Sequence, residues 1–176
     1  MGDRTTESAL VAFYRGDGRD HRGRLLSHIL GFGFDELEFH HDYIQWLFPL
    51  PEPSGANADA PLLSKEDIAA FESDESLRKA LRKSFHMMLQ FYGLVVWEGR
   101  PEIKVTRGAR FAERRDVWLT GGNHNFLRIS RMLRSLTLLG LGRHATAFLK
   151  FLEGLYSEDA RIIGDTTMGY WRRAVE

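Results

Sequence analysis

The 176-residue sequence has no cysteine, no excess of charge of either sign and no long apolar run. The lack of cysteine excludes disulfides, thiolate catalysis and cysteine-based zinc sites. Lys plus Arg and Asp plus Glu each number 24, so no net field directs the chain to nucleic acid or acidic membranes. No apolar run approaches the roughly 18 residues of a membrane span, and the N-terminus lacks the apolar core of a signal peptide. These absences favour a soluble, cytoplasmic protein.

The sequence is rich in amphipathic helical patterns. Apolar residues recur at spacings of three and four, and the segments predicted to be helical include residues 6–14, 22–30, 34–48, 74–92, 123–139, 142–156 and 166–175. A chain of this length most often forms one domain. The sequence therefore predicts a mostly α fold, a compact single-domain bundle of about seven to nine helices spanning residues 1–176.

Two segments interrupt the helical pattern. Pro49 ends the helix at 34–48, and the three further prolines in residues 50–63 predict a long, stiff, Pro-rich loop. Ser64 and Asp67 then resemble a capping box at the start of the next helix. Residues 98–110, "EGRPEIKVTRGAR", combine turn and β signals and favour one small β-hairpin.

A glycine pattern at residues 140–145, "GLGRHA", matches the dinucleotide-binding fingerprint G-x-G-x-x-A. That fingerprint requires a buried parallel strand before it, which would not carry charges. Here Arg128, Arg131 and Arg134 recur at every third position before Gly140, as on a helix. The pattern therefore predicts a corner between two helices, with Gly140 ending the first.

Histidine and nucleophile motifs give no catalytic assignment. His40 and His41 cannot face one metal ion from a helix, because adjacent helical residues point about 100° apart. The sequence has no H-E-x-x-H, G-x-S-x-G or Walker A pattern. We therefore expect no metal, no cofactor and no catalytic residues. A hydrolase-type enzyme with His41 or His124 as general base stays open as an alternative.

Polar residues lie on two otherwise apolar helices. Glu38, Asp42 and Gln45 have the spacing of one face of the helix at 34–48, and Arg128 and Arg131 share a face of the helix at 123–139. If these faces meet, they form either a buried ion-pair network that fixes helix packing or a polar ligand pocket.

A family resemblance appears at residues 41–49, "HDYIQWLFP", and continues through Glu52, Ser54, Asn57 and the run from Ala60 to Leu62. The segments "FYGL" at 91–94 and "HNFLRISR" at 124–131 add to it. Together they resemble the conserved domain of the opioid growth factor receptor family, best matched over residues 13–142. The resemblance implies a receptor or binding activity, since animal members are receptors for the enkephalin pentapeptide that act at the nucleus to restrain proliferation. This chain is expected to be a short, single-domain member.

The sequence thus predicts a non-enzymatic binding domain for a short peptide or small polar ligand. Asp42 would hold a ligand amine, Arg128 or Arg131 a carboxylate, and Trp46 an apolar side chain. The full candidate set is His41, Asp42, Gln45, Trp46, Asn57, His124, Asn125, Arg128 and Arg131. The alternative is a protein–protein interaction or homodimerisation module whose polar core is purely structural. No nucleic-acid partner is expected.

Overall fold

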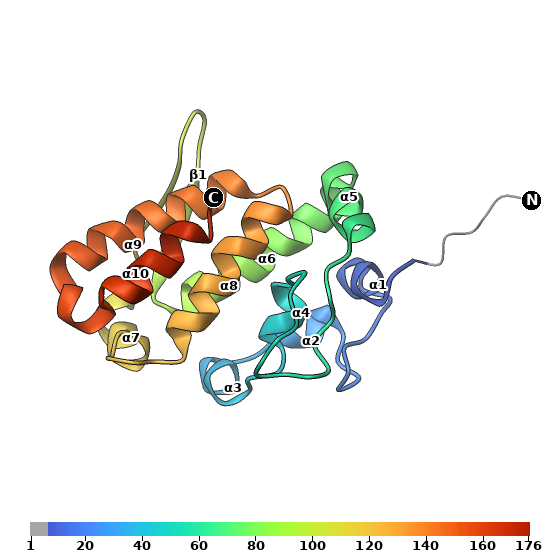
Figure 1. Ribbon diagram of the computed structural model, residues 1–176, viewed down its shortest axis with the longest axis horizontal. Coiled ribbons are helices and arrows are strands. Elements are labelled where there is room, and N and C mark those ends of the chain that lie inside the picture. The colour runs from blue at the N-terminus through green and yellow to red at the C-terminus, as the bar shows by residue number, and fades with distance from the viewer. Residues whose placement is uncertain (1–6) are drawn as a thin grey trace, which may run out of the picture. The chain divides into compact units, whose positions relative to one another are not determined.

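A computed structural model describes residues 7–176, and it contains ten α-helices and one two-stranded sheet in that part of the chain (Figure 1). The elements are α1 (Ala9–Arg15), α2 (Leu26–Leu30), α3 (Phe34–Phe39), α4 (Ile44–Leu47), α5 (Lys65–Ser73), α6 (Glu75–Phe91), β1 (Leu94–Glu98), β2 (Ile103–Arg107), α7 (Phe111–Trp118), α8 (Asn125–Leu138), α9 (Gly142–Ile163) and α10 (Asp165–Arg173). The predicted mostly α fold with one small hairpin is confirmed. The chain divides into two compact units, one ending at Leu81 and the other formed by Arg82–Glu176.

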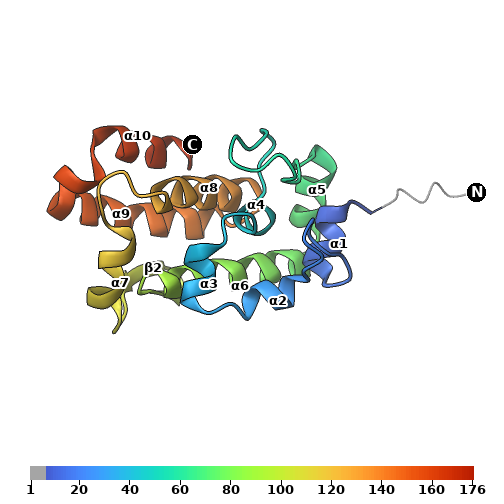
Figure 2. The same ribbon diagram turned by 90° about the horizontal axis from the view of Figure 1, so that it is seen from below.

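In the first unit, α1 and α5 lie side by side and share one capping site (Figure 2). Ser8 caps α1 by accepting from the Val11 N–H at 3.1 Å, and its hydroxyl donates to the Asp67 carboxylate. Asp67 also accepts from the Ser64 N–H at 2.9 Å, while the Ser64 hydroxyl accepts from the Asp67 N–H at 3.0 Å. The predicted capping box is therefore confirmed. Of the predicted first helix, Thr6 lies outside the described residues.

The core of the first unit is aromatic. Its fully buried members include Phe13, Leu37, Tyr43, Leu47, Phe48, Phe71 and Leu77. Tyr14 and Phe71 pack edge to face with their ring centroids 4.9 Å apart, and Phe13 and Trp46 do so at 5.2 Å. Burial of one such side chain contributes about 1.5–3 kcal/mol. This core holds α4 and the loop after it in place.

The predicted single helix at 34–48 is wrong, because the chain leaves the helical conformation between α3 and α4. His40 is extended, with φ −82° and ψ 134°. The buried Tyr43 hydroxyl donates to the Leu37 carbonyl at 2.7 Å, which satisfies one of the carbonyls that the end of α3 leaves open. As a result, Glu38 does not share a helix face with Asp42 and Gln45.

The Pro-rich loop is confirmed, and it returns to its starting point. Pro49 follows Phe48, the C-cap of α4. Leu50 and Leu62 form an isolated parallel bridge in which the Leu63 N–H donates to the Leu50 carbonyl at 3.0 Å. The two ends of the loop are thus fixed to each other. This closure places Asn57, inside the loop, against the turn that carries Asp42.

In the second unit, α8, α9 and α10 lie side by side, and α9 also packs against β2 (Figure 1). Its largest fully buried side chains are Tyr92, Phe85, Phe91, Trp118, Phe148 and Trp171. The predicted corner between α8 and α9 is confirmed: Gly140 has φ +81°, and the Leu141 N–H donates to the Leu136 carbonyl at 2.8 Å. Helix α9 continues to Ile163, past its expected end at Tyr156, with a kink at Asp159.

Strands β1 and β2 pair antiparallel, with Trp97 opposite Lys104 and Val95 opposite Thr106. The four residues 99–102 form the turn, and the Gly99 N–H donates to the Glu102 carbonyl at 3.1 Å. Helix α7, which the sequence pattern did not predict, follows the hairpin. Within residues 7–176, no helix has the length and apolar character needed to cross a membrane.

Candidate functional site

The candidate site in the first unit is built on the segment between α1 and α2. The Asp20 side chain is fully buried and accepts from the N–H groups of Arg22 and Arg24, at 2.9 and 2.8 Å, and from Arg24 Nε at 2.6 Å. Gly23, between the two arginines, has φ +77°, which favours glycine. Asp20 therefore fixes the backbone and directs both guanidinium groups to one side.

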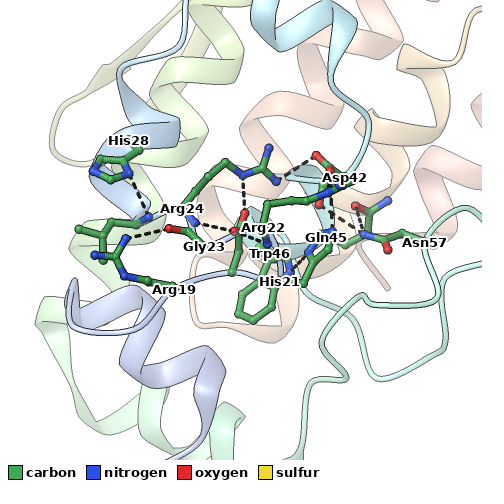
Figure 3. A network of polar contacts seen from close by, with 12 residues as sticks. Arg19, His21, Arg22, Gly23, Arg24, His28, Asp42, Gln45, Trp46 and Asn57 are labelled. Carbon is green, nitrogen blue, oxygen red and sulfur yellow. Dashed lines mark hydrogen bonds and ion pairs between the residues drawn. The ribbon is translucent and has the colours of Figure 1, made fainter.

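Both guanidinium groups converge on Asp42. Arg24 Nη2 donates to Oδ1 at 2.9 Å, and Arg22 Nε donates to Oδ2 at 2.9 Å (Figure 3). Partial burial raises the pKa of the Asp42 carboxyl, but the hydrogen bonds and charges of Arg24 and Arg22 outweigh this effect and hold the pKa below 3.8. Asp42 is therefore ionised at neutral pH and already paired within its own unit.

An aromatic pair lies beside this carboxylate. The Trp46 indole N–H donates to His21 Nδ1 at 3.0 Å, and His21 Nε2 lies 3.7 Å from Asp42 Oδ2. The two rings are stacked, with an angle of 17° between their planes. Trp46 is largely buried, so it forms the apolar wall of the cluster.

Gln45 and Asn57 complete the cluster from α4 and the Pro-rich loop. Asn57 Nδ2 donates to the Asp42 carbonyl at 3.3 Å and lies 3.4 Å from Gln45 Oε1 (Figure 3). Gln45 is buried. We call this group the Asp42 cluster, and its members are Asp20, His21, Arg22, Arg24, Asp42, Gln45, Trp46 and Asn57.

Four predicted site residues therefore meet in the first unit: Asp42, Gln45, Trp46 and Asn57. His41 is exposed and precedes Asp42 in the chain. The sequence analysis did not include Asp20, His21, Arg22 and Arg24 among the candidate site residues. The sequence did contain a signal, because Asp20 precedes Arg22 by two residues and Arg24 by four, with Gly23 between the arginines. In such a turn the aspartate side chain accepts from the backbone N–H groups just after it.

The other predicted residues belong to the second unit, at the start of α8. Asn123 Oδ1 accepts from the Asn125 N–H at 2.9 Å, which satisfies one of the free N–H groups of the helix. Arg128 Nη1 lies 3.3 Å from Asn125 Oδ1, and Asn125 Nδ2 lies 3.4 Å from His124 Nε2. Asn125 and Arg128 are buried, and Arg131 follows one turn later, partly exposed. The ligand roles of these residues stay predictions.

A second titratable cluster, also unforeseen, joins the hairpin to two helices of the second unit. Glu98 Oε1 lies 3.0 Å from His86 Nε2 of α6 and 2.9 Å from His144 Nε2 of α9. Burial raises the pKa of Glu98, but hydrogen bonds from both imidazoles outweigh it and bring the pKa below 4.5. Burial lowers the pKa of His144 below 6.5. These positions are too far apart in sequence for any spacing motif, and we call the three residues the Glu98 bridge.

Metal coordination does not explain either cluster. In the part of the chain that the structure describes, no group of three or more His, Cys, Asp or Glu side chains is arranged to hold a metal ion. The contacts of the Asp42 cluster include charge-assisted hydrogen bonds, which are shorter and stronger than those between neutral groups.

Comparison with known proteins identifies the family. The model of the opioid growth factor receptor conserved region matches residues 26–176. The opioid growth factor receptors of Mus musculus and Homo sapiens are 37% and 35% identical over 144 residues, which cover 81% of this chain but 22% and 21% of those proteins. The opioid growth factor receptor-like protein 1 of Xenopus tropicalis is 37% identical over 107 residues, 61% of this chain and 20% of its own.

The chain thus spans about a fifth of the length of these relatives. No solved structure matches it. The matched region overlaps most of residues 13–142, where the resemblance was first found, and includes "HDYIQWLFP" together with the whole of the second unit. The chain belongs to the opioid growth factor receptor family.

Proposed function

We propose that this domain binds a short peptide or another small polar ligand, without catalysis, and that the Asp42 cluster contacts it. The names of its relatives describe receptors, which supports a binding role. The observation that carries the proposal is the Arg22 side chain. It is 66% exposed and contacts Asp42 only through Nε.

The terminal nitrogens of Arg22 make no hydrogen bond to any other described residue. A guanidinium group held by Nε keeps its two terminal nitrogens available for two parallel hydrogen bonds to a carboxylate. In this proposal, Arg22 takes the ligand carboxylate, a role that the sequence had suggested for Arg128 or Arg131.

Asp42 keeps its predicted role as acceptor of a ligand amine. A carboxylate has about four acceptor positions, and its two arginine partners use one on each oxygen. The partly exposed His21 ring, with the buried Trp46 indole beside it, would pack against an apolar part of the ligand. Such a ligand carries both a positive and a negative group, as a peptide with free termini does.

Isothermal titration calorimetry with short peptides tests the proposal. The panel contains each peptide with free ends, with an acetylated N-terminus and with an amidated C-terminus. Arg22→Gln is expected to weaken binding of free-acid peptides by about tenfold or more, the loss of a charged hydrogen-bonded pair. Arg22→Gln should have little effect on the binding of C-terminally amidated peptides. Asp42→Asn should weaken the binding of peptides with a free N-terminus and have little effect on the acetylated ones.

Arg19→Gln is the matched control, because Arg19 is an exposed arginine of the same segment that bonds only to the Gly23 carbonyl. Circular dichroism checks that each variant is folded. If folded Arg22→Gln and Asp42→Asn proteins bind the whole panel as the wild type does, the Asp42 cluster is a packing element and the proposal is wrong.

A further inference from the structure

Trp97 of β1 stands apart from the other three tryptophans. Its side chain is 59% exposed, whereas Trp46, Trp118 and Trp171 are buried. Val95, two residues earlier on the same face of the strand, is also exposed. An exposed tryptophan is a frequent anchor of protein interfaces, because one ring supplies a large apolar area with little conformational freedom to lose.

The position of the indole is set by the turn beside it. A Cβ atom at position 99 would lie 1.7 Å from Cη2 of Trp97, so the ring occupies space that only a glycine leaves open. Gly99 is itself fixed by the hydrogen bond of its N–H to the Glu102 carbonyl. The ring therefore lies across the turn although it faces solvent.

The end of the hairpin is also tied to the helices behind it. Glu98, the residue after Trp97, contacts both His86 and His144 in the Glu98 bridge. On the other side of the turn, Arg143 of α9 donates to the Pro101 carbonyl. A surface that is ordered before binding loses less entropy when a partner docks.

Two positive charges flank the indole. Lys104 lies directly opposite Trp97 in the strand register, and Arg100 is in the turn. Both side chains are exposed, and neither side chain forms an ion pair or hydrogen bond with another residue of the described chain. The one acidic residue of the turn, Glu102, faces Lys150 at 3.9 Å.

We propose that this surface, the Trp97 face (Val95, Trp97, Arg100, Lys104 and Thr106), docks an acidic linear segment of another protein. An apolar side chain of that segment packs on the indole, and carboxylates on either side pair with Lys104 and Arg100. Charges at the rim of such a contact select the partner and speed its association. The inference is independent of the proposed function, because none of its residues belongs to the Asp42 cluster.

Charge favours an acidic peptide over a polyanion. Nucleic-acid surfaces carry a long basic stripe that neutralises many phosphates. The Trp97 face has two unpaired cations, and the whole chain has 24 positive and 24 negative side chains. Two cations around one apolar ring fit two carboxylates around one apolar side chain.

Tryptophan fluorescence provides the assay, since Trp97 is the solvent-exposed reporter. The probes are octapeptides with a central Leu or Phe between two runs of Glu, and the same peptides with Lys in place of Glu. The acidic set is expected to shift the emission to shorter wavelength, with an affinity that falls several-fold as salt increases. Calorimetry then measures the variants: Trp97→Ala should weaken binding by about 30-fold or more, and Lys104→Glu by about tenfold.

The matched controls are Phe39→Ala, a still more exposed aromatic in the first unit, and Lys65→Glu, an exposed lysine of α5. Both should bind as the wild type does. Lys104→Glu leaves the apolar packing intact, so it tests the surface even if Trp97→Ala alters the hairpin. Equal binding of both peptide sets, no binding of either, or preferential binding of phosphatidylserine vesicles or a dT12 oligonucleotide would each overturn the proposal.

Discussion

Replacement of Asp20 by alanine is expected to destabilise the first unit more than any other change in the Asp42 cluster. The Asp20 side chain is completely buried and accepts two backbone N–H groups and the Arg24 guanidinium. In Asp20→Ala, the N–H groups of Arg22 and Arg24 lose their acceptor, and Arg24 keeps Asp42 as its remaining carboxylate. The segment would then no longer hold the two guanidinium groups in register.

The size of the stability loss in Asp20→Ala follows from the burial of the Asp20–Arg24 ion pair. Breaking a buried ion pair by removing one partner costs about 3–5 kcal/mol. Arg24 is 16% exposed and retains its bond to Asp42, so the low end, about 3 kcal/mol, applies here. For a protein of this size, 1 kcal/mol shifts the Tm by about 2–4 °C, so Asp20→Ala should lower the Tm by roughly 6–12 °C.

Thermal and urea unfolding followed by circular dichroism measure this loss. Asp20→Asn keeps an oxygen acceptor for the backbone but removes the charge, and it should lose about half as much. Asp17→Ala, an exposed acid of the same segment, should change stability by no more than about 0.5 kcal/mol. If Asp20→Ala melts within about 2 °C of the wild type, the segment does not depend on this carboxylate and the reasoning fails.

Three smaller predictions concern other parts of the fold. Burial lowers the pKa of His144, so the unfolded chain binds the proton more readily, and wild-type stability should fall as the pH drops below about 6.5. Urea unfolding at pH 7.5 and 5.5 should show that the free energy of unfolding falls less between these pH values in His144→Gln than in the wild type. An equal fall in both proteins would contradict this role of His144. Gly140→Ala should cost about 1 kcal/mol because φ is +81° there, and an unchanged Tm would contradict the Gly140 turn. Ser64→Ala should cost about 1 kcal/mol by removing the α5 cap, measured by urea unfolding, with Ser27→Ala in α2 as exposed control.

The parts of the fold that local chemistry determines could be predicted from the sequence. Gly140 follows a continuous apolar pattern and precedes an apolar residue, which is sufficient to place a helix end and the turn after it. Ser64 and Asp67 fix the start of α5 for the same reason, since both hydrogen bonds of a capping box form within four residues.

Elements that depend on distant contacts could not be predicted in this way. Helix α7 contains four charged residues among eight, and its buried residues are Phe111, Arg114 and Trp118, so no ordinary apolar stripe marks it. Arg114 is stabilised there by donating to the Phe91 carbonyl and by lying over the Phe91 ring at 4.8 Å. From the sequence alone, Arg114 would be expected at the surface, because its partner Phe91 lies 23 positions away.

The residues of the candidate site divide in the same way, into those that local contacts bring together and those that depend on distant contacts. The sequence suggested Asp42, Gln45, Trp46 and Asn57, and they do meet, because the loop closes at Leu50 and Leu62 and brings Asn57 back to Asp42 and Gln45. The arginine partners of Asp42 could not be predicted in this way. They lie 18 and 20 residues upstream, and the local pattern around Asp20 does not indicate that Asp42 is the carboxylate they bind.

The bond between Trp46 and His21 fixes the tautomer of the neutral imidazole. An indole N–H can only donate, so His21 Nδ1 must carry no proton, and the neutral ring has its hydrogen on Nε2, toward Asp42. The Trp46 indole therefore decides which ring nitrogen of His21 carries the hydrogen, and so which group the imidazole turns toward Asp42.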